Sequence, residues 1–115
     1  LGLDDVPSHL PKELTTVNLI LTFTLLVLLT PITEEVFFRG FIFHGLEVSW
    51  GVWPAAIASS TIFSLMHGSI ALIVPVFLSG LILTWSLRKS RSIWPGILAH
   101  MAQNAMYIGA MVNAT

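Results

Sequence analysis

Two adjacent glutamates, Glu34 and Glu35, come shortly after a run of residues, 17–30, that is apolar nearly throughout. A helix that is apolar on all sides is either buried in a large core or exposed to lipid. Carboxylates beside such a run cost free energy unless a partner neutralises or solvates them. The doublet therefore limits the chain to folds that bring other polar groups to this place.

The composition is that of a membrane protein. The 115 residues are 55% hydrophobic and 10% charged, whereas soluble domains are about 25% charged. The net charge of −1 argues against a nucleic-acid partner. The lack of cysteine excludes a disulfide framework and a thiolate nucleophile. We therefore expect an integral membrane protein with the lipid bilayer as its partner, and a piece of a longer polytopic chain, since the sequence begins without Met.

We predict an all-α, polytopic transmembrane bundle of about four membrane segments. Residues 1–13 are expected to form a polar extramembrane lead-in, and residues 14–115 the transmembrane core. The predicted segments are residues 14–30, 53–67, 70–87 and 93–112, close to the ~17–25 residues that a span requires. Pro31 predicts a kink or break, with Thr33 as the N-cap of a separate helix to about residue 47. The glutamates would then lie on a broken or re-entrant segment.

The basic residues Arg88, Lys89 and Arg91 fall in one short loop. Positive charge is enriched in the cytoplasmic loops of membrane proteins, so we expect the loop at residues 88–91 to be cytoplasmic. The small residues at 55, 56 and 58–60 favour close packing of the helix 53–67 against its neighbours.

The two glutamates have different local environments. Glu35 and Arg39 are four residues apart, so on a helix they share a face and are expected to pair as structural support. Glu34 has no such local partner. Its best candidate partner is His67, which lies on another helix.

Three further polar groups lie in the apolar segments. His67 follows Phe63 by four residues, and His100 precedes Asn104 by four. Taken singly, each has an ordinary structural interpretation: a hydrogen-bonded histidine at a helix end, or a polar pair that joins two helices. Counted along straight helices, the two histidines lie about 21 and 12 Å from the start of their helices, so we expect irregular helix geometry to bring them together.

As a set, these groups predict hydrolytic chemistry. If they meet, Glu34 and His67 would deprotonate a water molecule, while His100 and Asn104 would donate hydrogen bonds to a developing oxyanion. Glu34, His67 and His100 are also the ligand types of a hydrolytic zinc site. The residues alone leave the two mechanisms open.

The three motifs resemble those of the CAAX-protease and bacteriocin-processing (Abi, CPBP) family of intramembrane endopeptidases. They read Glu34-Glu35-Val-Phe-Phe-Arg39, Phe63-Ser-Leu-Met-His67 and His100-Met-Ala-Gln-Asn104. The resemblance covers roughly residues 30–110, in matching order and spacing.

This resemblance implies an endopeptidase that cuts a prenylated (CAAX-type) protein or a bacteriocin-like peptide at the membrane, here the plasma membrane of a prokaryote. It implies catalytic roles for Glu34, His67 and His100, with Asn104 assisting, and leaves zinc open as a cofactor. Two alternatives stand beside it. One is a non-catalytic bacteriocin-immunity or binding protein on the same scaffold, and the other is a transporter fragment with a Glu/His relay.

Overall fold

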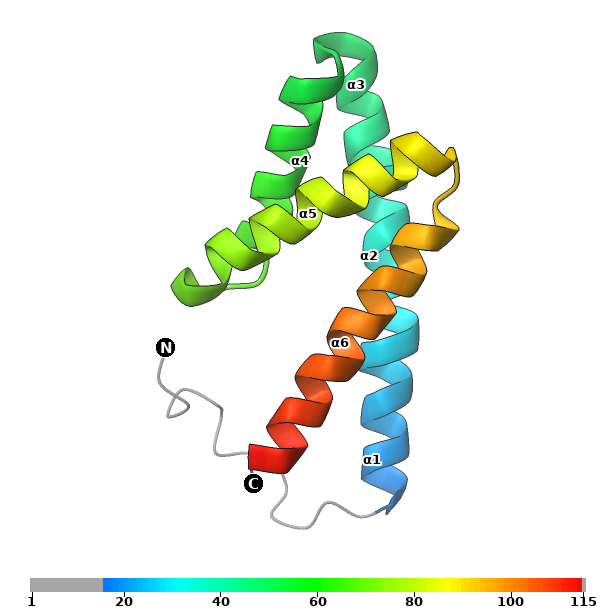
Figure 1. The fold of residues 1–115 in the computed structure, drawn as a ribbon, viewed down its shortest axis with the longest axis vertical. Coiled ribbons are helices and arrows are strands. Elements are labelled where there is room, and N and C mark those ends of the chain that lie inside the picture. Colours follow the sequence, from blue (N-terminus) through cyan, green and yellow to red (C-terminus); the bar gives the residue numbers. More distant parts are fainter. Residues whose placement is uncertain (1–15, 115) are drawn as a thin grey trace.

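The computed structural model describes residues 16–114 (Figure 1), and the lead-in at residues 1–13 lies outside them. Every element in the described part is helical, which confirms the all-α prediction there. The elements are α1 (Thr16–Phe23), the π-helix η2 (Thr24–Leu29), α2 (Thr30–Glu35), the π-helix η3 (Val36–Phe43), α3 (His44–Trp50), α4 (Val52–Leu65), α5 (Ile70–Ser90) and α6 (Trp94–Ala114).

The first five elements form one helix of 35 residues, Thr16–Trp50. The predicted break at Pro31 and the re-entrant segment are therefore wrong. The backbone stays helical at Leu29 (φ −75°, ψ −45°) and at Thr30 (φ −60°, ψ −48°). Thr33 does not cap a new helix, because its hydroxyl donates to the Leu29 carbonyl at 2.9 Å. A wider π turn directly before Pro31 accommodates the proline within a continuous helix.

Three turns fold the remaining helices back onto this long helix. Gly51 has φ +83° between α3 and α4, and Gly68 has φ +67° between α4 and α5. Arg91 adopts the left-handed conformation after α5. Figure 1 shows α5 running obliquely across the long helix, and α6 lying beside α2 and then diverging from α1 towards its C-terminal end. The chain contacts agree, since α6 packs against both η2 and α2.

Two helices of the described residues are long and apolar enough to cross a membrane: Thr16–Trp50 and Ile70–Ser90. Both are largely exposed along their apolar windows, as lipid-facing helices are. Helix α4 has 14 residues and is short for a span. Helix α6 has 21 residues but carries His100, Gln103 and Asn104. The number of four membrane segments is therefore not confirmed.

Helix α4 packs through small side chains, as the sequence predicted. Its buried residues are Ala55, Ala56, Ser59, Ser60, Phe63 and Ser64. Helix α5 approaches α4 and the long helix at Gly80. A Cβ atom built on Gly80 would lie 2.9 Å from Ser60 Oγ and 3.2 Å from Arg39 Nη2. The absence of a side chain at this position allows the three helices to meet.

We expect Gly80→Ala to lower the free energy of unfolding by about 1–3 kcal/mol, since the added methyl overpacks this contact. The matched control is Gly45→Ala. Gly45 lies in α3 with nothing within 4 Å of an added Cβ, so the change should be neutral or slightly stabilising. Unfolding by denaturant in detergent measures both variants. Equal effects of the two substitutions would contradict close packing at Gly80.

Candidate active site

His100 lies between the two glutamates. Its Nδ1 is 2.8 Å from Oε1 of Glu35, and its Nε2 is 3.3 Å from Oε2 of Glu34. The His100 side chain is 4% exposed, whereas that of Glu34 is 29% exposed. A buried imidazole is thus held between a buried carboxylate and one that is partly exposed. The first and third motifs meet here, but the partner of Glu34 is His100 rather than the predicted His67.

Arg39 neutralises Glu35 within the long helix. Its Nη1 lies 3.3 Å from Glu35 Oε1, and both side chains are only 1% exposed. This confirms the predicted pairing one helical turn apart. Arg39, Glu35 and His100 therefore form one buried group, and Glu34 contacts His100 from a partly exposed position.

The Phe63 ring is the common contact of the three motifs. Arg39 lies over its face, with Cζ 4.3 Å from the ring centroid. The His67 and His100 rings both pack edge-on to it, at centroid distances of 4.9 and 5.7 Å. Phe38 of the long helix adds a fourth ring at 5.0 Å. The two histidines are therefore neighbours of one phenyl ring on α4.

His67 lies in the turn after α4 and is exposed. Its Nδ1 is 2.8 Å from the Phe63 carbonyl. A carbonyl oxygen only accepts hydrogen bonds, so Nδ1 carries the proton and donates it. In the neutral ring, Nε2 then has a free lone pair and is available as a proton acceptor.

Asn104 makes a contact that the sequence did not predict. Its Nδ2 donates to the main-chain carbonyl of Leu26 at 2.8 Å. Among the described residues, the structure gives it no hydrogen bond to either glutamate. The only sequence signal for this contact is Pro31, whose missing N–H leaves a carbonyl of the preceding turn in need of a donor.

The proposed zinc ligands do not converge. In the described part of the chain, no three His, Asp or Glu side chains are grouped closely enough to hold a metal ion. Glu34 and His100 are in contact, but His67 is bonded through Nδ1 to its own helix end. In this arrangement the three side chains do not fit a common zinc site.

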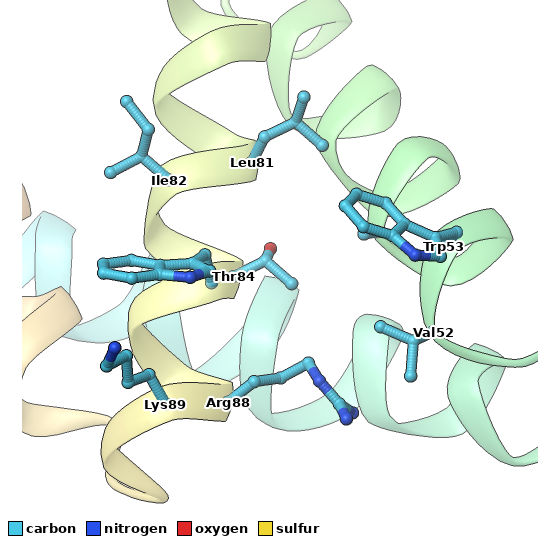
Figure 2. A pocket seen from close by; sticks show the side chains of 9 residues that line it. Val52, Trp53, Leu81, Ile82, Thr84, Arg88 and Lys89 are labelled. Carbon is cyan, nitrogen blue, oxygen red and sulfur yellow. The ribbon is translucent and has the colours of Figure 1, made fainter.

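A separate pocket of about 780 Å³ lies between α4 and α5 (Figure 2). Its lining is mainly apolar, with Trp53 and Trp85 on its walls and the cations Arg88 and Lys89 near one end. None of the motif glutamates or histidines lines it. The pocket is therefore separate from the group around His100.

Comparison with known proteins agrees with the resemblance that the three motifs indicate. The model of the Type II CAAX prenyl endopeptidase Rce1-like family matches residues 16–106, which include all three motifs. The chain belongs to this family. It is also 28% identical over 78 residues to the Bacillus subtilis (strain 168) protein named "Putative membrane peptidase YdiL". That match covers 68% of this chain and 32% of the relative, so the chain spans about a third of the relative's length. No solved structure matches.

Family membership and the apolar helices together indicate an integral membrane protein. The large exposed apolar side chains of the long helix, such as Phe41 (71% exposed), are compatible with a hydrocarbon environment. This Rce1-like chain also bears its motif residues in the expected order. Helix α2 and its junction with η3 carry the first motif, the end of α4 the second, and α6 the third.

Proposed function

We propose that this chain carries the hydrolytic centre of an intramembrane endopeptidase. The observation that carries the proposal is the contact between the partly exposed Glu34 and the buried His100 at 3.3 Å. A carboxylate and an imidazole at hydrogen-bonding distance form a general acid–base pair. Membership of the Rce1-like family supports peptide-bond hydrolysis as the reaction of this pair.

In the proposed reaction, Glu34 accepts a proton from a water molecule as the water oxygen attacks the carbonyl carbon of the scissile bond. The carbonyl oxygen becomes an oxyanion. As the C–N bond breaks, the same proton is delivered to the leaving nitrogen, directly from Glu34 or through Nε2 of His100. Glu35 accepts from Nδ1 of His100 and so orients the ring, as the carboxylate does in a hydrolase triad.

His67 is the third proposed catalytic group. His67 is exposed and its Nε2 is a proton acceptor in the neutral ring, so it suits a second base that orients the attacking water, as the sequence predicted. The shared Phe63 ring supports a common site for His67 and His100. Glu35 and Arg39 act as supports, because both are buried and paired with one another.

The proposed substrate is a peptide or prenylated protein held at the membrane. The family description names a prenyl endopeptidase, and this supports a lipid-anchored substrate. We further propose that the protein resides in the plasma membrane of a prokaryote with residues 88–91 on the cytoplasmic side. Arg88, Lys89 and Arg91 support this orientation.

The test is cleavage of prenylated and unmodified membrane-anchored peptides by the full-length protein in detergent, in water enriched in ¹⁸O. We expect a shortened product with one ¹⁸O atom in its new carboxylate. Binding without any product would favour the immunity-protein alternative. Proton-linked flux in vesicles without product would favour the transporter alternative.

Treatment with a chelator tests whether peptide cleavage requires a bound zinc ion. We expect cleavage to persist after treatment with a zinc chelator, since the described residues offer no group of three ligands. The rate before and after treatment is measured on the same peptide. Loss of the rate, followed by its recovery on addition of zinc, would contradict the metal-free reaction.

A further inference from the structure

Pro31 removes the main-chain donor of the Leu26 carbonyl. Within η2 the hydrogen bonds join residues five apart, and the N–H of Thr30 donates to Leu25. With the same spacing of five residues, the carbonyl of Leu26 would accept a hydrogen bond from the N–H of residue 31. Proline has no N–H, so this position of the ladder cannot be filled by the main chain. In hydrocarbon no water replaces the donor, and another protein group must do so.

Asn104 supplies that donor from another helix. Its amide Nδ2 lies 2.8 Å from the Leu26 oxygen, 78 residues away in sequence. Pro31 itself is fully buried. Among the described residues, Pro31 is the only proline inside the long helix, and it interrupts the main-chain hydrogen bonding there. The Asn104 side chain therefore supplies the missing hydrogen bond.

We propose that Asn104 is a positioning residue, which substitutes for the donor that Pro31 lacks and thereby sets the position of His100. His100 lies one turn before Asn104 on α6. The two side chains contact the long helix on opposite sides of Pro31: Asn104 at Leu26, and His100 at the two glutamates. The catalytic part of this inference rests on the proposed function.

The geometry makes His100 sensitive to this link. Its contact with Glu34 is 3.3 Å, so a displacement of α6 by about 1 Å would separate the pair, and a misplacement of that size typically costs about 100-fold in rate. An asparagine that served only as an oxyanion donor would have no reason to depend on the residue at position 31. A positioning role therefore predicts that the effect of replacing Asn104 depends on the residue at position 31, whereas an oxyanion role predicts that it does not.

The experiment is a double-mutant cycle in the full-length protein with Asn104→Leu, Pro31→Ala and the double variant. We expect Asn104→Leu to lower kcat by about 10–100-fold and to lower Tm. Pro31→Ala restores an N–H at residue 31, so the same Asn104→Leu change should cost at least about tenfold less in that background. If Asn104→Leu fails to fold, Asn104→Ala serves instead, because alanine has no side-chain donor for the carbonyl and is smaller.

Gln103→Leu is the matched control. Gln103 is the neighbouring amide on α6, and its Oε1 accepts from Ser79 on α5 at 2.8 Å. Its effect should be the same with proline or alanine at position 31. An equal loss of kcat from Asn104→Leu in both backgrounds, with Tm unchanged, would assign Asn104 to the oxyanion and overturn the proposal. A change in Tm without a change in kcat would overturn the positioning role.

A readout without catalysis separates this inference from the proposed function. In protein labelled with ¹⁵N-histidine, the ring resonances of His100 report its contacts with the two glutamates. We expect the Asn104→Leu substitution to shift the His100 resonances. In the double variant, which also carries Pro31→Ala, these resonances should return towards the wild-type values. If the wild-type protein cleaves no peptide but this pattern holds, the proposed function fails and the positioning role stands. Unshifted resonances overturn the positioning role.

Discussion

Glu34→Gln is expected to lower kcat for peptide cleavage by about 10²–10⁴-fold, the usual contribution of a general base. The amide keeps the shape of the side chain but cannot accept the proton of the attacking water. Because Glu34 is 29% exposed and remains able to bond His100, we expect little change in the free energy of unfolding. Initial rates and denaturant unfolding of the purified protein in detergent measure the two quantities separately.

The neighbouring substitution Glu35→Gln should behave differently. Glu35 is buried against Arg39 and His100, so its loss leaves a buried cation without its carboxylate. Both cleavage and stability should fall. Glu47→Gln is the control on the same helix, since Glu47 pairs with Arg88 near the surface and should leave the rate unchanged. A Glu34→Gln protein that cleaves at the wild-type rate would rule out the proposed base.

Arg39→Met is expected to produce the largest loss of stability, about 3–5 kcal/mol, because it leaves the Glu35 carboxylate buried without its cation. The substitution also removes the cation over the Phe63 ring. Methionine has a similar length and fills much of the same volume. Denaturant unfolding of the wild type and the variant in detergent gives the difference.

The double variant Glu35→Gln/Arg39→Met tests the cause of that loss. If the cost comes from an unpaired charge, removal of both charges should recover much of the stability. Cleavage should stay low, because the carboxylate that orients His100 is gone. Losses that simply add in the double variant would show that Glu35 and Arg39 do not act as a pair.

Local spacing in the sequence predicted the local contacts well. Glu35 and Arg39 pair at one helical turn, and Phe63 and His67 meet across the same interval. These contacts need only helical geometry, which the spacing specifies. The small residues of α4 also predicted its close packing, since packing in lipid depends mainly on side-chain size.

Contacts between helices were predicted less completely. The apolar setting indicated that Glu34 needs a partner from elsewhere, but both histidines satisfied that requirement and the structure pairs it with His100. Proline in an apolar run is compatible with a broken helix and with a continuous one. Which occurs at Pro31 depends on whether neighbouring turns and helices satisfy the freed carbonyl, and the Asn104 contact is not visible in a hydropathy pattern.

The partners of the two glutamates lie at very different distances along the chain, and this difference affects the order in which the two contacts can form. Glu35 and Arg39 are one turn apart, and a helix forms in about a microsecond, so this pair is complete as soon as the segment is helical. Glu34 meets His100 only after α6 has been made and inserted. The Glu35–Arg39 pair can therefore form before the contact between Glu34 and His100.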